Sequence, residues 1–104
     1  MNGPTILVVD DERSISEVIS LYLTRAGYRV KIANDGQSAL KELARQMPDL
    51  VVLDLMLPDR DGWEITRLIR SDATLGAMPI IMLTARVEDT DKIVGLELGA
   101  DDYI

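Results

Sequence analysis

Short apolar runs alternate with segments of helical periodicity along this 104-residue chain. This alternation restricts the possible folds more than any other property of the sequence. The runs at 6–9, 50–53 and 79–83 are rich in Ile, Val, Leu and Met and have the length of strands that are covered on both faces. Residues 15–23 instead place apolar side chains in one stripe with the period of an amphipathic helix. Strands and helices in turn predict one α/β domain, with helices on both faces of a parallel sheet.

The remaining elements are predicted from turn residues and periodicity. Residues 29–33 alternate polar and apolar side chains, which indicates a strand at the edge of the sheet. Ser14 and Glu17 have the spacing of a capping box for the first helix, and Gly27 is its expected C-terminal cap. Further helices are predicted after the turn at 34–36, through Ile65, Leu68 and Ile69, and through residues 93–98, and a fifth strand is predicted to begin at Tyr103.

Composition and charge exclude several classes of protein. The net charge of −7 argues against nucleic-acid binding by this segment, because affinity for the phosphate backbone comes from clustered Lys and Arg. The chain has no Cys, so disulfides and thiolate metal sites are excluded. The apolar runs are much shorter than the roughly 18 residues of a membrane-spanning helix, and the N-terminus has no basic signal region. We therefore expect a cytoplasmic protein without a membrane partner.

Acidic and hydroxyl side chains follow the predicted strands where each strand ends. Asp10 and Asp11 follow the first strand, Asp54 follows the third, and Thr84 follows the fourth. Because the carboxyl ends of parallel strands meet at one edge of the sheet, these side chains are expected to share a crevice. Carboxylates held together repel one another, and a hard divalent cation such as Mg²⁺ relieves that repulsion. Asp54 is the predicted nucleophile toward a phosphoryl group, and the Thr84 hydroxyl is expected to contact a phosphoryl oxygen.

These residues, in this order and spacing, resemble the receiver domains of two-component response regulators. The resemblance covers the whole chain and rests on four motifs, which are Asp10-Asp11-Glu12, Asp54 with Pro58 and Gly62, Pro79 through Thr84-Ala85, and Gly99-Ala100-Asp101-Asp102-Tyr103. It implies a flavodoxin-like, doubly wound parallel sheet of five strands in the order 2-1-3-4-5. It also implies that Asp11, Asp54 and the backbone carbonyl of Met56 ligate Mg²⁺, with Asp10 acting through a water.

The same resemblance implies a signalling function. A sensor histidine kinase would donate a phosphoryl group to Asp54, and Thr84 and Tyr103 would form a switch pair that alters the face of the fourth helix and fifth strand. The domain would catalyse only its own phosphorylation and slow dephosphorylation, so it is not expected to be an enzyme. The ending at 100–103 is similar to that of regulators that carry a winged-helix DNA-binding domain and form homodimers through that face. Transcription is therefore the expected output, with DNA bound by a separate output domain.

One family residue has no counterpart in this sequence. The family pattern has a Lys three residues after the switch aromatic, a position beyond Ile104. We therefore interpret residues 1–104 as a receiver domain truncated at its C-terminus, without the family's final helix. Loss of that helix is expected to expose apolar surface on one face of the sheet and to favour self-association.

Two other classes of protein and a plain structural role are the alternatives. Aspartate-nucleophile phosphatases of the haloacid dehalogenase type need a second acid two residues after the nucleophile, where this chain has Met56. A nucleotide-binding or flavin-binding module needs a Gly-rich turn after the first strand, where this chain has acids at 10–12. Acids after a strand also serve as helix N-caps. Asp59 and Asp61 are interpreted as solvated turn residues.

Overall fold

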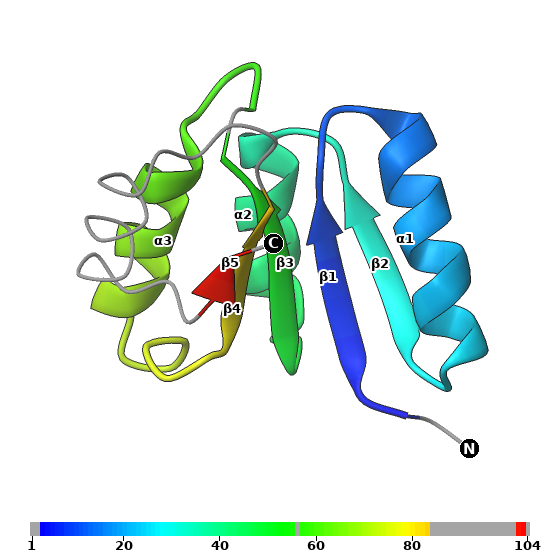
Figure 1. Ribbon diagram of the computed structural model, residues 1–104. Helices are drawn as coiled ribbons and strands as arrows, with labels where there is room; N and C mark the ends of the chain where they lie inside the picture. The colour runs from blue at the N-terminus through cyan, green and yellow to red at the C-terminus, as the bar shows by residue number, and fades with distance from the viewer. Residues whose placement is uncertain (1–2, 56, 84–101, 104) are drawn as a thin grey trace.

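A parallel sheet flanked by helices forms the body of the protein (Figure 1). The structure is a computed structural model, and it describes residues 3–55, 57–83 and 102–103. The elements are β1 (Thr5–Val9), α1 (Arg13–Arg25), β2 (Arg29–Ala33), α2 (Gly36–Arg45), β3 (Leu50–Asp54), α3 (Gly62–Ser71), β4 (Ile80–Leu83) and β5 (Asp102–Tyr103).

The strands lie in the order β2-β1-β3-β4-β5 and are parallel. The parallel α/β sheet and the order of its first four strands are as predicted. Of the fifth strand the structure describes two residues, Asp102 and Tyr103, which pair with Ile81 and Met82 of β4, so a full-length fifth strand stays a prediction. The helix predicted through 93–98 lies outside the described residues.

Burial separates the central strands from the edge strand. Every residue of β1 is buried, and this strand pairs with β2 on one side and β3 on the other. β2 lies at the edge and is largely accessible, as its alternating sequence predicted. Gly27 precedes it with φ of 98°, the left-handed conformation that commonly ends a helix.

Successive residues of the central strands face opposite sides of the sheet, and each side has its own apolar cluster. Leu7 and Val9 of β1 join a cluster that includes α2 and α3, whereas Ile6 and Val8 join one that includes α1. This arrangement is the doubly wound α/β architecture that the alternation of strands and helices predicted. No helix among the described residues has the length and hydropathy needed to cross a membrane.

Helix α1 departs from its prediction in two ways. Its N-cap is Glu12, and no side chain bonds there, so the predicted capping box of Ser14 and Glu17 is wrong. The apolar stripe of this helix is also only half covered. Ile19 and Leu23 contact the sheet, whereas other large apolar side chains stay exposed, namely Ile15, Val18, Leu21 and Tyr22, at 41–65% of their surface. The period of a stripe identifies the helix, but the neighbouring elements decide how much of the stripe is buried.

We predict that the chain self-associates through the exposed side of α1. A Val18→Glu substitution should shift the protein toward monomer, because it places a charge in an apolar contact. Sedimentation velocity over a range of concentrations measures this shift. Thr24→Glu adds the same charge at an exposed polar position of the same helix and should leave the distribution unchanged. A wild-type chain that stays monomeric at every concentration would contradict the prediction.

Candidate metal centre

Three carboxylates meet at the carboxyl edge of the sheet. Asp10 directly follows β1, and Asp54 is the last residue of β3, the strand beside it. Asp11 comes next in the chain after Asp10. One carboxylate oxygen from each of the three lies within 4.8 Å of the others. The fold therefore brings together residues that are more than forty positions apart, as the strand order predicted.

Asp10 is the most enclosed of the three acids, with 4% of its surface exposed. Burial raises the pKa of its carboxyl above the ordinary value, a hydrogen bond from the backbone N–H of Glu12 to Oδ1 opposes the rise, and the charge of Asp11 adds to it. Burial and the neighbouring charge both reflect the cost of keeping negative charge at this edge. A cation bound between the acids would lower that cost.

The ligand atoms at this edge fit a hard divalent cation. All three residues offer carboxylate oxygens, the ligand type that such cations prefer. Asp10 is buried, Asp54 is half-buried and Asp11 is exposed, so the group runs from the interior to solvent. Beside one or two carboxylates, a hard divalent cation commonly takes waters or phosphate oxygens as its further ligands.

The loop after Asp54 is held against the end of β3 by Gly62. The N–H of Gly62 donates to the carbonyl of Leu55 at 2.8 Å. A Cβ at residue 62 would lie 2.6 Å from the carbonyl oxygen of Asp54 and 2.9 Å from the Cα of Leu55. Only a residue without a side chain allows this approach, so Gly62 contributes to the backbone geometry of Asp54.

Two loop acids interpreted as solvated turn residues have structural partners. Asp61 caps α3 by accepting from the N–H of Trp63 at 2.6 Å and of Glu64 at 3.3 Å. Asp59 accepts from the N–H of Gly36 at 2.7 Å and of Gln37 at 3.0 Å, at the start of α2. The Gly36 bond is the main reason that the pKa of Asp59 lies below its ordinary value.

Sequence reasoning could have found one of these two roles. Asp61 stands directly before the first apolar turn of a predicted helix, which is the signature of an N-cap. No local pattern marks Asp59, because its partners are 22 and 23 residues away in the sequence. Asn34 was also missed, although its side-chain amide donates to the carbonyl of Asp10 at 2.8 Å.

Three further predicted site residues are not placed by the structure. Met56 and Thr84 lie outside the described residues. Tyr103 is described through its backbone pairing with Met82, and its side chain is outside the description. The metal role of Met56 and the switch roles of Thr84 and Tyr103 therefore stay predictions.

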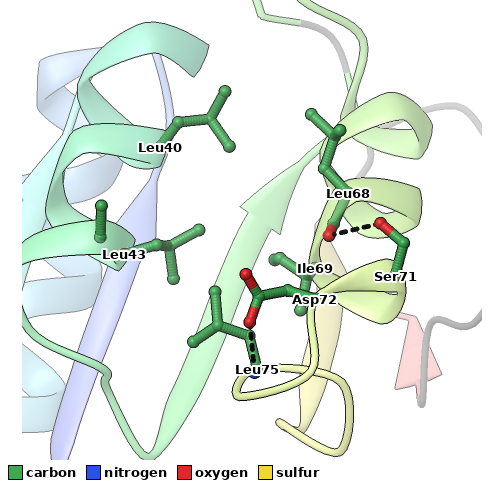
Figure 2. A pocket seen from close by; sticks show the side chains of 8 residues that line it. Leu40, Leu43, Leu68, Ile69, Ser71, Asp72 and Leu75 are labelled. Atoms are coloured by element: carbon green, nitrogen blue, oxygen red, sulfur yellow. Dashed lines mark hydrogen bonds between the residues drawn. The ribbon is translucent and has the colours of Figure 1, made fainter.

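An apolar hollow of about 450 Å³ lies between α2 and α3, and none of the three acids lines it. Figure 2 shows Leu40 and Leu43 of α2 on one side, opposite Leu68 and Ile69 of α3, with Leu75 below. The carboxylate of Asp72 already accepts from the N–H of Leu75 at 3.0 Å. The hollow thus has the character of an incompletely filled contact between two helices, and the acid edge is the candidate site.

A comparison with known families decides the identity of the chain. A family model described as the response regulator receiver domain matches residues 6–104. The chain belongs to this family. Its acid edge is thus the acidic pocket of a receiver domain, which is where such domains bind a divalent metal.

Known relatives of this receiver domain are transcriptional regulatory proteins. It is 48% identical over 103 residues to the transcriptional regulatory protein GltR of Pseudomonas aeruginosa, covering 99% of this chain and 43% of that protein. It is 52% identical over 99 residues to the alkaline phosphatase synthesis regulator PhoP of Bacillus subtilis, covering 95% of this chain and 40% of that protein. The receiver domain therefore spans about two fifths of the length of these relatives.

A solved receiver domain has the same fold. The crystal structure of the BeF₃-activated N-terminal receiver domain of RstA from Klebsiella pneumoniae superposes with a TM-score of 0.89 at 37% identity, and the match covers 96% of this chain and 83% of that one.

We predict that Gly62→Ala disturbs both stability and the acid edge. The added Cβ would meet backbone atoms that cannot move away alone, so the free energy of unfolding should fall by about 1–3 kcal/mol, the usual cost of overpacking. Urea denaturation measures this loss. Gly76→Ala is the control. Its Cβ would meet the Asp72 carbonyl oxygen at 3.0 Å, away from Asp10, Asp11 and Asp54. Equal stability of Gly62→Ala and wild type would count against a tight approach at residue 62.

We predict that Asp10→Asn stabilises the metal-free receiver domain at neutral pH. The folded-state pKa of Asp10 is raised, so this residue favours folding least at pH values above that pKa, where its carboxylate is charged. The gain in Tm from the substitution should be largest at neutral pH, should shrink as pH falls through the raised pKa of Asp10, and should be gone below the ordinary pKa of Asp. Thermal melts in a chelating buffer between pH 3 and 8 test this, and a gain that grows toward acid pH would contradict it.

Proposed function

We propose that this receiver domain is a phosphorylation switch that accepts a phosphoryl group on Asp54 from a sensor histidine kinase, in a reaction that depends on Mg²⁺. The observation that carries the proposal is the meeting of three carboxylates within 4.8 Å at the carboxyl edge of the sheet, in a chain of the receiver family. One of them, Asp54, is half-buried and ends a central strand, so its backbone is held by the sheet.

The proposed reaction is the transfer of one phosphoryl group. A carboxylate oxygen of Asp54 attacks phosphorus and forms a new O–P bond, which makes the side chain an acyl phosphate. The bond from phosphorus to the donor's imidazole nitrogen breaks. The electron pair of the broken bond stays on that nitrogen. If the other ring nitrogen of the phosphorylated histidine carried a proton, the donor leaves as a neutral imidazole. Because Asp54 must attack as the carboxylate, the reaction needs the acid edge to stay ionised at neutral pH.

Asp11, Asp54 and the backbone carbonyl of Met56 would hold Mg²⁺, and Asp10 would act through a water. When bound, the cation neutralises negative charge on the acids and on the transferred group. The residues of this chain supply the rest. The sheet orients Asp54, the Glu12 N–H orients the carboxylate of Asp10 at 2.9 Å, and the Thr84 hydroxyl would bond a phosphoryl oxygen.

The proposed output is a change in the face formed by the fourth helix and β5. Thr84 would move toward the phosphoryl group and Tyr103 would turn inward, which shifts a population between two arrangements. Activation of the RstA receiver by BeF₃ supports a switch of this kind in a relative. The domain would turn over no other substrate, so its only chemistry is its own phosphorylation and slow dephosphorylation.

The proposed partners follow from the relatives. GltR and PhoP are transcriptional regulatory proteins, which supports transcription as the process controlled, with DNA bound by an output domain outside these residues. Homodimer formation through the fourth-helix and β5 face is the proposed consequence of phosphorylation, and the cytoplasm is the proposed location.

The proposal is tested with a small phosphodonor. Incubation of the chain with acetyl phosphate and Mg²⁺ should add the mass of one phosphoryl group to wild type, and Asp54→Asn should add none. Asp61→Asn is the matched control, because it removes an acid from the same loop and keeps an oxygen that can cap α3. Chelation of the metal should abolish the reaction. A phosphorylated Asp54→Asn, or a metal-independent reaction, would overturn the proposal.

A second measurement separates the switch from a hydrolase. Steady release of phosphate from a phosphomonoester in the presence of Mg²⁺ would favour an aspartate-nucleophile phosphatase instead. The side chain two residues after Asp54 is that of Met56, which has no acidic group to protonate a leaving alcohol. We therefore expect no turnover.

A further inference from the structure

We propose that the turn Asn34-Asp35-Gly36, between β2 and α2, ties the loop after β1, which carries Asp10 and Asp11, to the loop that follows Asp54 at the end of β3, and that Asn34 and Asp59 are positioning residues for the metal centre. We call this turn the β2–α2 tie. Neither residue belongs to the acid cluster itself. The inference rests on the proposed function, because it concerns how the magnesium ligands are held.

The first contact of the tie is with the loop after β1. The side-chain amide of Asn34 donates to the carbonyl of Asp10 at 2.8 Å. That carbonyl belongs to the peptide group that links Asp10 to Asp11, so the bond restricts the rotation of this group. The N–H of Asp10 also donates to the carbonyl of Ala33 at 3.1 Å. The backbone of Asp10 is thus held through both its N–H and its carbonyl by consecutive residues of one segment.

The second contact is with the loop after β3. Both carboxylate oxygens of Asp59 accept from the tie and the residue after it, Oδ1 from the Gly36 N–H at 2.7 Å and Oδ2 from the Gln37 N–H at 3.0 Å. These N–H groups are the first two of α2 and have no partner within the helix, so the carboxylate satisfies them and lies at the positive end of the helix dipole.

The absence of a side chain at Gly36 lets the loop after β3 approach the turn closely. A Cβ at residue 36 would lie 2.8 Å from Cβ and Cδ of Arg60, so the loop touches the turn where Gly36 has no side chain. Arg60 is itself paired with Glu64 of α3 at 2.6 Å. The loop is therefore held between the start of α2 and the first turns of α3.

The tie is fixed to helix α2 and passes the carboxyl end of β1. Asp35 caps α2 by accepting from the Ser38 N–H at 2.7 Å, which fixes the turn to the helix. The strand order places β1 between β2 and β3. A turn that follows β2 and contacts the loop after β3 must therefore pass the carboxyl end of β1, beside Asp10 (Figure 1).

The tie bears on metal binding because the acids repel one another. Without support, the loops after β1 and β3 would move apart to relieve that repulsion, and a cation would then have to draw them together. A tie that holds both loops beforehand reduces this cost, as partners of metal ligands commonly do. The two contacts act in series, so loss of either one weakens the link between the two loops.

The test is the affinity of the chain for Mg²⁺ alone, measured by isothermal titration calorimetry and by the emission of Trp63, the single Trp of the sequence. Asn34→Ala and Asp59→Ala should each weaken binding on the order of 10-fold, the lower end of the range for residues that support metal ligands. The double variant should bind no more weakly than about the weaker single variant, because the contacts are in series.

Two control variants and one property of Asn34→Ala separate positioning from charge and from stability. Asn34→Ala removes no charge, so its effect cannot come from charge loss. Asp59→Asn keeps the volume and one acceptor oxygen, and its affinity should fall between those of wild type and Asp59→Ala. Asp72→Ala also removes a carboxylate that accepts from two backbone N–H groups, those of Thr74 and Leu75, but in a turn away from the acids. It should lower the Tm and leave Mg²⁺ affinity unchanged.

The outcomes distinguish this inference from the function on which it rests. If the wild-type chain binds no Mg²⁺, the proposed metal centre and the tie are both wrong. If wild type binds Mg²⁺ and Asn34→Ala and Asp59→Ala bind it equally well, the tie alone is wrong. If the two losses multiply in the double variant, the contacts act independently and the series arrangement is overturned. Equal loss of affinity in Asp72→Ala would show that general destabilisation is the cause.

Discussion

Repulsion among three carboxylates at one edge of a parallel sheet is the constraint around which this molecule is arranged. β1 and β3 are neighbouring, parallel and buried on both faces, so their carboxyl ends must meet, and Asp10 and Asp54 meet with them. The apolar burial of these strands keeps the acids in place against their repulsion, because moving them apart would disrupt the core. Burial at this edge raises the pKa of Asp10, and the charge of Asp11 adds to the rise.

The loops around the acids show how the fold resists this repulsion. Asn34 holds the peptide after Asp10, Asp59 joins the loop after β3 to α2, and Gly62 lets that loop close against the carbonyl of Asp54. Each contact uses backbone groups, so the acids are oriented through the chain that carries them. The cation affinity and the stability of a receiver domain built in this way are linked, since a bound cation favours the folded state.

The sequence predicted most of the fold and the acids of the site, and it failed where an outcome depended on distant neighbours. Strand-length apolar runs predicted β1, β3 and β4, and polar alternation placed β2 at the edge. The stripe of α1 identified a helix, but Val18 and Tyr22 are exposed because nothing described in the structure covers them. Asp59 is exposed, as predicted, but its bonds to the N–H groups of Gly36 and Gln37 were not predicted, because no local pattern connects residues 22 and 23 positions apart.

By itself, the sequence determined which residues form strands and helices and which acids end the strands, because periodicity and turn chemistry act over a few residues. Only the tertiary structure decided how those acids lie relative to one another and which loop residues hold them. The bonds from Asn34 to Asp10 and from Gly36 to Asp59 join residues 24 and 23 positions apart. Such contacts exist only after the strand order has brought β2, β1 and β3 side by side, and the strand order is a property of the whole packed chain.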